Sequence, residues 1–140
     1  MNDESLSMFI VNQMLSKDEF SKWMNLKVLN AKPGAVNVSC KVKEEMLNGF
    51  GITHGGVSYS LADSALAFSS NAHGRHAVSV ETSISHVQKV FLGDVLRTEV
   101  TEVSLNHKIG IYHITILNQH EVEVAHFKGT VYRSDKEWES

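Results

Sequence analysis

The sequence lacks the features that mark nucleic-acid-binding, secreted and metal-dependent proteins. Lysine and arginine number 13 against 16 aspartates and glutamates, so the net charge is −3, whereas a nucleic-acid-binding surface needs a concentration of positive charge. Cys40 is the only cysteine, which excludes an internal disulfide and suggests a reducing, cytoplasmic location. The eight histidines form no H-E-x-x-H pattern or similar helical pair, so no metal site is predicted.

Long hydrophobic runs are also missing. No segment approaches the roughly 18 consecutive apolar residues of a membrane-spanning helix. The first residues, MNDESLSMFIVNQML, are acidic where a secretory signal peptide is basic. A phosphate-binding GxxxxGK(S/T) loop is absent as well. We therefore expect a protein with no membrane segment, secretory signal or nucleotide-binding loop.

The 140 residues suit one domain, residues 1–140, with enough length to bury one core. Apolar spacing predicts an N-terminal helical segment within residues 1–24, interrupted near Ser16–Asp18, and a second helix over Gly55–Ala72. Alternating apolar residues predict strands over Leu26–Ala31, Ala35–Val42, His76–Val90, Val95–Leu105, Lys108–Leu117 and Glu121–Tyr132. This order is typical of an α+β fold in which an antiparallel sheet packs on one long helix.

The segment NGFGITHGGVSYSLADSALAF, Asn48–Phe68, carries the strongest functional signal. Thr53-His54-Gly55-Gly56 precedes the predicted helix, whose first backbone N–H groups lack partners and carry positive potential. Glycine lets another molecule approach that backbone closely. Three interpretations are open: a phosphate site, a site for a carbonyl oxygen that becomes an oxyanion during acyl transfer, or a plain tight turn.

Asp63 lies inside the same helix. The predicted core stripe of this helix is Val57, Leu61, Ala65 and Phe68. At about 100° per residue, Asp63 lies about 200° from Leu61 and points away from that stripe. The other residues on its face are small, namely Gly56, Ser60, Ala67 and Ser70. Such a face permits close approach of a second subunit or a ligand, although Asp63 could also be a solvated surface acid.

These residues resemble a known family. The pattern Asn48-x5-His54-Gly55-Gly56-x6-Asp63, continued through VSVETSISHVQKVFLGD to AHFKGTVYR, is similar to the hotdog-fold acyl-CoA thioesterases of the PaaI-like branch, which is typified by a phenylacetate-pathway thioesterase. The resemblance runs from Val42 to the C-terminal strands. It implies a hotdog fold, in which an antiparallel sheet wraps around one long central helix, with the N-terminal helix in addition.

The resemblance also implies a role for individual residues. Gly55 would give its backbone N–H to the thioester carbonyl, and Asp63 of the neighbouring subunit would act as general base or nucleophile. Asn48 and His54 would shape the site, and Ser79 would help to position water. The resemblance therefore implies a homodimer, or a homotetramer made of two dimers, with sites at the dimer interface. It implies no cofactor, because coenzyme A is part of the substrate.

Several further residues are candidates for substrate contact or remain open. Gly56 belongs to the same glycine pair, and Lys89 and Arg75 could meet the phosphates of coenzyme A, although both charges could instead be solvated. Glu81 is either a second acid or a solvated strand carboxylate. Cys40 is expected to be a buried, small apolar residue.

The predicted activity is hydrolysis of acyl-CoA to a free acid and coenzyme A. The resemblance suggests an aryl-acetyl substrate such as hydroxyphenylacetyl-CoA, or a medium-chain acyl-CoA. Two alternatives remain open. A non-catalytic acyl-CoA-binding hotdog module would not need Asp63, and a hotdog hydratase or dehydratase would use a histidine together with an acid.

Overall fold

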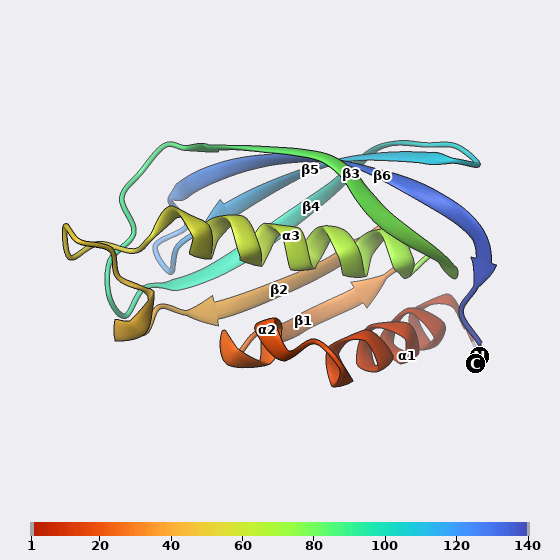
Figure 1. Ribbon diagram of the computed structural model, residues 1–140, viewed down its shortest axis with the longest axis horizontal. Helices are drawn as coiled ribbons and strands as arrows, with labels where there is room; N and C mark the ends of the chain where they lie inside the picture. Colours follow the sequence, from red (N-terminus) through yellow and green to blue (C-terminus); the bar gives the residue numbers. More distant parts are fainter. Residues whose placement is uncertain (1, 140) are drawn as a thin grey trace.

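The computed structural model describes residues 2–139 and shows an antiparallel sheet curved around one long helix (Figure 1). The helices are α1 (Asp3–Ser16), α2 (Glu19–Trp23), the short 3-10 helix η1 (Glu44–Met46) and α3 (Gly55–Asn71). The strands are β1 (Lys27–Lys32), β2 (Ala35–Lys41), β3 (Arg75–His86), β4 (Val95–Leu105), β5 (Ile109–Leu117) and β6 (Glu123–Glu137). The α+β prediction is confirmed. Met1 and Ser140, the two ends of the predicted domain, lie outside the described residues.

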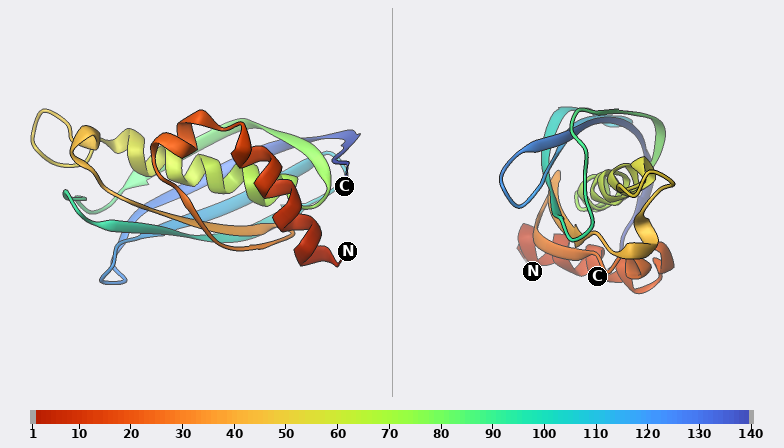
Figure 2. Two further views of the ribbon diagram at one scale, coloured as in Figure 1. Left: turned by 90° about the horizontal axis from the view of Figure 1, so that it is seen from below. Right: turned by 90° about the vertical axis from the view of Figure 1, so that its left-hand side faces the viewer.

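The sheet has six strands in the order β1-β2-β4-β5-β6-β3, so β1 and β3 are its edges. Seen along the axis of α3, the sheet curls around the helix (Figure 2). The predicted core stripe of α3 is confirmed, because Leu61, Ala65 and Phe68 are buried in one cluster with the inward side chains of the sheet. This packing fixes how α3 is turned about its own axis, and therefore which of its side chains remain accessible.

The N-terminal helices pack beside α3 and β1 (Figure 1). The predicted interruption near Ser16–Asp18 is confirmed, because Asp18 ends the gap as the N-cap of α2 and accepts the Ser21 N–H at 2.9 Å. The Ser21 hydroxyl lies 2.9 Å from the Ser64 hydroxyl on α3. This contact holds α2 against the residue next to Asp63.

Two strand predictions were wrong at their ends. The strand predicted over His76–Val90 ends at His86, where β3 pairs for the last time with β6. Val87 and Gln88 still donate to the Val124 carbonyl of β6, at 2.9 and 3.3 Å, and the chain then leaves the sheet, so that the Val90 carbonyl accepts the Thr53 N–H at 2.8 Å. A bulge between Ser79 and Glu81 also interrupts the predicted alternation of faces. At the C-terminus, β6 continues five residues past the predicted end at Tyr132.

Cys40 is buried in β2, as predicted. Burial raises the pKa of its thiol to about 11, so the thiol stays protonated at neutral pH. A protonated, enclosed thiol is a packing group rather than a nucleophile. Among the described residues, no helix is both long enough and apolar enough to cross a bilayer.

Gly129 on β6 lies against Leu66 of α3 and offers a test of this packing. A Cβ at Gly129 would lie 2.5 Å from Cδ2 of Leu66, which is itself buried. We expect Gly129→Ala to lower the free energy of unfolding by about 1–3 kcal/mol through overpacking. Chemical denaturation measures this loss. Gly49→Ala is the control, because a Cβ there meets nothing within 4 Å, and an equal loss in both variants would contradict the packing argument.

Candidate active site

The N-terminus of α3 is capped by His54. The His54 backbone is extended (φ −61°, ψ 135°), and its Nδ1 accepts the Gly56 N–H at 2.9 Å. The His54 carbonyl accepts the Val57 N–H at 3.0 Å. Across residues 2–139 the Gly55 N–H has no hydrogen-bond acceptor. Gly55 therefore keeps a free donor at the positive end of α3.

The cap also limits what His54 itself can do. A ring nitrogen that accepts an N–H bond carries no proton and has its lone pair engaged. His54 Nδ1 is occupied in this way, which fits a shaping role better than that of a general base. The cap also makes the two glycines different, because the Gly56 N–H is hydrogen-bonded to His54 and the Gly55 N–H is not hydrogen-bonded to any described residue.

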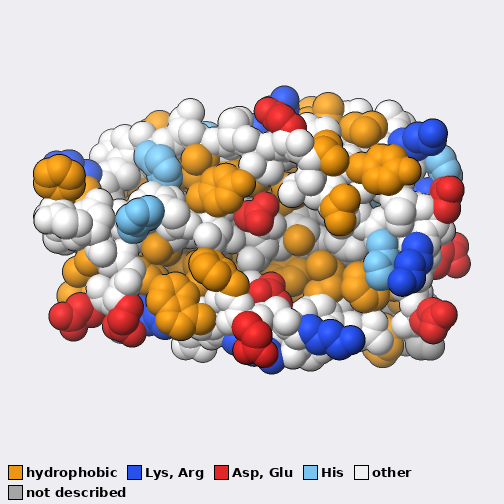
Figure 3. Space-filling view, in the orientation of Figure 1, with side chains coloured by type: hydrophobic (Ala, Val, Ile, Leu, Met, Phe, Trp, Pro, Cys, Tyr) orange, Lys and Arg blue, Asp and Glu red, His pale blue; other side chains and the backbone are white. Residues whose placement is uncertain are grey.

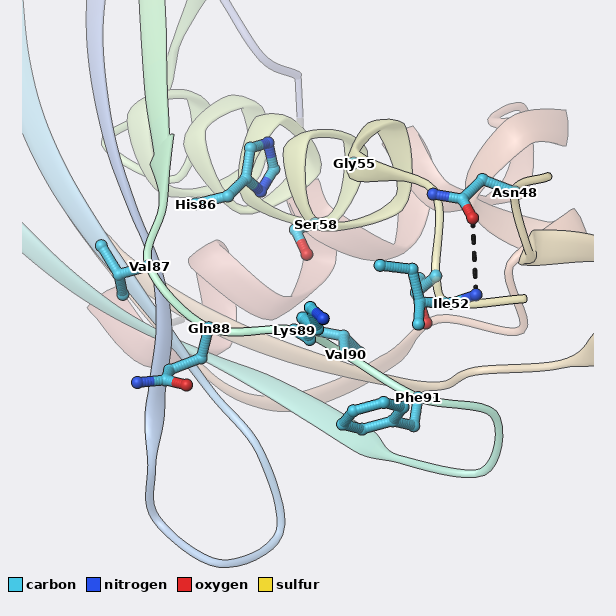
Figure 4. Close-up of a pocket in the computed structure, with 11 residues that line it drawn as sticks. Asn48, Ile52, Gly55, Ser58, His86, Val87, Gln88, Lys89, Val90 and Phe91 are labelled. Carbon is cyan, nitrogen blue, oxygen red and sulfur yellow. Dashed lines mark hydrogen bonds between the residues drawn. The ribbon is translucent and has the colours of Figure 1, made fainter. Parts of the chain in front are cut away.

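Asn48 organises the loop before α3. The side-chain oxygen of Asn48 accepts the backbone N–H of Phe50 at 2.9 Å and that of Ile52 at 3.4 Å, and the second of these bonds is drawn in Figure 4. The backbone N–H of Asn48 donates to the Ile52 carbonyl at 2.7 Å. Asx side chains hold tight turns through such bonds. In this chain the Asn48 side chain therefore supports the loop that delivers His54 and Gly55 to the start of α3.

A cavity of about 640 Å³ lies beside Gly55. Its lining combines the predicted residues Asn48, Gly55 and Lys89, and Thr53 of the predicted Thr53–Gly56 segment, with residues that sequence reasoning did not assign to the site, namely Ser58, His86, Gln88 and Phe91. Figure 4 shows the segment from His86 to Phe91 running past the first turn of α3. His86 and Gln88 lie near the end of the strand predicted over His76–Val90, but only the fold shows that this end reaches the start of α3.

The His86 side chain approaches Gly55 closely at this cavity. A Cβ at Gly55 would lie 3.1 Å from Nε2 of His86, which is tighter than ordinary van der Waals contact. The Thr53 hydroxyl lies in a residue that lines the same cavity, and this buried oxygen has no hydrogen-bond partner anywhere in residues 2–139. A buried unpaired hydroxyl is destabilising by about 1–3 kcal/mol.

Asp63 lies in a different cavity, of about 250 Å³, which it shares with the predicted residue Ser79 and with Val78 and Met14. The carboxylate is half-buried. Burial raises the pKa of the Asp63 carboxyl above its ordinary range, and repulsion from Asp18 raises it further. Asp63 is therefore a partly buried and partly desolvated acid rather than a fully solvated one.

The two cavities are separated along one helix. Gly55 and Asp63 are eight residues apart on α3, which at 1.5 Å per residue is about 12 Å. That distance is too long for one thioester carbonyl to contact both groups. One chain therefore holds the predicted residues in two separate cavities, one with Gly55, Asn48 and Lys89 and the other with Asp63 and Ser79.

Two predicted substrate contacts lie elsewhere. Arg75 begins β3 at the far end of α3 from Lys89, and its guanidinium binds the His107 carbonyl and lies 3.7 Å from Asp135. Within one chain the structure does not bring Arg75 and Lys89 together. Gly56 faces a further cavity, lined in part by Phe20 and Trp23, rather than the cavity beside Gly55.

The predicted small-residue face of α3 is only partly outward. Ser70 is buried and donates its hydroxyl to the Leu66 carbonyl at 2.8 Å, so its placement on an open face was wrong. The N-terminal helix covers this end of α3, which sequence periodicity could not show. Gly56, Ser60 and Asp63 stay partly accessible. On this side of the molecule, hydrophobic side chains gather over the middle and most charged ones lie towards the rim (Figure 3).

No group of three or more His, Cys, Asp or Glu side chains is placed to hold a metal ion in the described part of the chain. The candidate groups are the Gly55 amide at the start of α3, the Asp63 carboxylate, and the polar residues that line the two cavities. Such an arrangement suits polarisation of a carbonyl and delivery of water or a carboxylate to it.

Comparison with known proteins agrees with this chemistry. The family model described as Thioesterase superfamily matches residues 50–125. The acyl-coenzyme A thioesterase PaaI of Escherichia coli is 32% identical over 120 residues, which cover 86% of each chain. The solved structure of the E. coli PaaI protein from the phenylacetic acid degradation operon has a TM-score of 0.94 at 29% identity, covering 97% of this chain and 99% of that one.

A second solved structure was obtained with a ligand. The smu.793 protein of Streptococcus mutans, bound to acetyl CoA, has a TM-score of 0.78 at 28% identity and covers 81% of this chain and 92% of that one. The family match spans the Gly55 amide, Asp63 and most of the sheet, and the PaaI structure matches the whole fold. The chain belongs to the Thioesterase superfamily and is a PaaI-like hotdog acyl-CoA thioesterase.

Proposed function

We propose that this protein hydrolyses the thioester of an aryl-acetyl-CoA, such as hydroxyphenylacetyl-CoA, or of a medium-chain acyl-CoA, in a site shared by two subunits. The observation that carries the proposal is the separation of a free Gly55 amide from the confined Asp63 by about 12 Å on one helix. Two copies of α3 side by side and antiparallel would bring each Asp63 towards the other copy's Gly55.

The β3 edge supports such a dimer. Val78 and Val80 on this edge strand are 62% and 59% exposed, and an exposed apolar edge is a template for pairing with another chain. Val78 also lines the Asp63 cavity, so pairing there would enclose the carboxylate. A homodimer is thus the smallest complete unit, and pairing of two dimers into a homotetramer is compatible with it.

The chemistry follows from the two halves. The Gly55 N–H donates to the carbonyl oxygen and stabilises the negative charge that develops there. Asp63 of the other subunit either removes a proton from water as it attacks or attacks the carbonyl carbon itself to form an anhydride that water then opens. In both routes the C–S bond breaks, coenzyme A leaves as a thiol and one water is consumed. Ser79, in the Asp63 cavity, would orient that water.

The remaining residues fit supporting roles. Asn48 and His54 hold the loop and the helix start in place. Lys89 lines the Gly55 cavity and is the better candidate for the phosphates of coenzyme A, because the Arg75 guanidinium is already engaged. The substrate proposal rests on the phenylacetic acid operon of the E. coli relative. The proposed cytoplasmic location rests on the lone, protonated Cys40.

The two alternatives are less well supported. A hydratase or dehydratase needs a histidine beside an acid, yet His54 caps a helix through Nδ1 and has no acidic partner among residues 2–139. A non-catalytic binding module would not need the Asp63 carboxylate of one subunit near the free Gly55 amide of the other. Thiol release from acyl-CoA by the wild type is the direct test, and its complete absence over aryl, short, medium and long acyl groups would refute the proposal.

Removal of either half of the site tests the mechanism. Gly55→Pro deletes the N–H, but proline suits the first helical position and the extended His54 before it. We expect kcat to fall about 10²–10³-fold, whereas Gly55→Ala, which keeps the N–H, should fall much less. Asp63→Asn should lower kcat by about 10²–10⁴-fold. Equal activity of Gly55→Pro and Gly55→Ala would exclude the amide as the carbonyl donor.

Mixed subunits test whether the site is shared. Gly55→Pro and Asp63→Asn proteins are each expected to be inactive as pure oligomers. After co-refolding in equal amounts, a hybrid dimer has one site with both defects and one intact site, so about a quarter of the wild-type activity should return if hybrids form at random. Thiol release from the mixture measures this recovery. A mixture as inactive as its parents would show that each site is built within one chain.

The acidic limb of the pH–rate profile tests the environment of Asp63. The reaction needs the ionised carboxylate, so activity should fall as pH falls through its raised pKa. Asp18→Asn removes the repelling charge while an asparagine can still cap α2. It should lower the pKa of Asp63 and move the acidic limb to lower pH. Glu19→Gln removes the neighbouring charge, whose side chain is 87% exposed, and an equal shift there would contradict a specific effect of Asp18.

A further inference from the structure

Most histidines of this chain are engaged with another residue. Of the eight histidines, six bind or stack on another group, namely His54, His73, His76, His107, His113 and His126. The side chains of His86 and His120 have no hydrogen-bond or ion-pair partner among residues 2–139. His120 is exposed in the turn between β5 and β6, whereas His86 lines the cavity beside Gly55. Both ring nitrogens of His86 are therefore available to a ligand in that cavity.

The Nε2 end of the His86 ring points at Gly55. From the position that a Cβ of Gly55 would occupy, Nε2 lies at 3.1 Å, Cε1 at 3.3 Å and Cδ2 at 3.7 Å. The ring extends from the end of β3 towards α3 (Figure 4). Nε2 carries a proton in one neutral tautomer of imidazole and in the imidazolium ion. A side-chain donor therefore faces the residue whose backbone N–H is free.

The two donors are close enough to share one acceptor. A Cβ position lies about 2.5 Å from the backbone nitrogen of its own residue, so the nitrogen of Gly55 and Nε2 of His86 are at most about 5.6 Å apart. Hydrogen bonds of about 2.9 Å from two nitrogens can meet at one oxygen when the nitrogens lie within about 5.8 Å of each other. A carbonyl oxygen has two lone pairs with which to accept them.

We propose that His86 is a catalytic residue of this enzyme, and that its Nε2–H donates a second hydrogen bond to the thioester carbonyl oxygen, beside the Gly55 N–H. This assignment rests on the proposed function, because it takes the Gly55 amide as the position of the carbonyl. His86 keeps its proton during the reaction, since Asp63 supplies the base or the nucleophile. Its hydrogen bond becomes stronger as negative charge develops on the oxygen, so it lowers the barrier more than it tightens substrate binding.

Other polar groups around Gly55 are occupied or enclosed. The Gly56 N–H is bound by His54, the Asn48 side-chain oxygen accepts two N–H groups of its own loop, and the Thr53 hydroxyl is buried. The His86 side chain is exposed within one chain and can reach a substrate.

The sheet holds the backbone of His86 in place. His86 is the last residue of β3 and pairs with Ala125 of β6. A donor on a fixed strand end needs little rearrangement when charge develops on the carbonyl oxygen, and such preorganisation is what makes an oxyanion donor effective.

A matched pair of variants tests the donor. His86→Leu removes both ring nitrogens, and we expect kcat for phenylacetyl-CoA to fall about 10²-fold, as for the loss of one oxyanion donor, with KM changed by less than about threefold. His86→Gln is similar in size to leucine and places an amide N–H as far along the side chain as Nε2. It should recover at least about tenfold of the lost kcat. His120→Leu is the control, because the same change at an exposed histidine outside the cavity should leave kcat at the wild-type value.

Infrared spectroscopy of a bound thioester separates hydrogen bonding from a structural role. The full-length Asp63→Asn protein is loaded with phenylacetyl-CoA that carries ¹³C at the thioester carbonyl. A hydrogen bond weakens the C=O bond, so adding His86→Leu should move the carbonyl band to higher frequency, and adding His86→Gln should move it less. S-ethyl-CoA has no carbonyl, and calorimetry should show that its affinity is the same with and without His86→Leu.

The outcomes separate this proposal from the hydrolytic function. A carbonyl band that ignores His86→Leu would overturn the role of His86, and so would equal losses of kcat in His86→Leu and His86→Gln. Weaker binding of S-ethyl-CoA by the leucine variant would also overturn it, because it would indicate a general change of the cavity. If the band responds to His86 but the wild type releases no thiol, the carbonyl contact stands and the hydrolytic function fails.

Discussion

The rise of an α-helix sets the distance between the two groups that we propose take part in the reaction. Gly55 and Asp63 are both on α3, and eight residues of helix hold them about 12 Å apart. Packing inside the curved sheet fixes the rotation of α3 through Leu61, Ala65 and Phe68, so neither group can turn towards the other. A second copy of the same helix is the simplest source of the missing half. The proposed oligomerisation would follow from the positions of Gly55 and Asp63 on one rigid helix, and the exposed β3 edge is the surface on which we propose that it occurs.

The start of α3 illustrates how a cap can create a reactive position. Most helices satisfy their first N–H groups with side chains or water. Here His54 binds the Gly56 N–H, and the amide left over is that of Gly55, which faces a cavity with an unpaired threonine hydroxyl. The helix N-terminus is thus stabilised at one amide and left open at the next. The His86 side chain passes close to Gly55, which links the beginning of α3 to the end of β3.

The sequence predicted most helices and strands correctly, but it predicted the burial and the neighbours of individual side chains less consistently. Periodicity located α3, its buried stripe and the break before α2, because these depend on neighbours within a few residues. The same periodicity placed Ser70 on an open face, although α1 packs there, and extended the third predicted strand past His86, although the chain leaves β6 at that point. Arg75 and Lys89 were grouped by charge alone, but α3 separates them. Ser58 and His86 escaped notice because nothing local distinguishes a serine or histidine that lines a cavity from one that does not.

The sequence by itself determined the α+β order, the capped glycine start of α3, the position of Asp63 relative to the core stripe and, through the Asn48 to Asp63 pattern, the family. Each of these is encoded by spacing within one segment. Only the tertiary structure decided that His86–Phe91 passes the helix start, that α2 walls an apolar cavity beside Gly56, and that Asp63 is confined near Asp18. These arrangements join residues that are distant in the chain. They follow from how the sheet curves and how the N-terminal helices cover α3, so they depend on burial of apolar surface over the whole domain rather than on any local pattern.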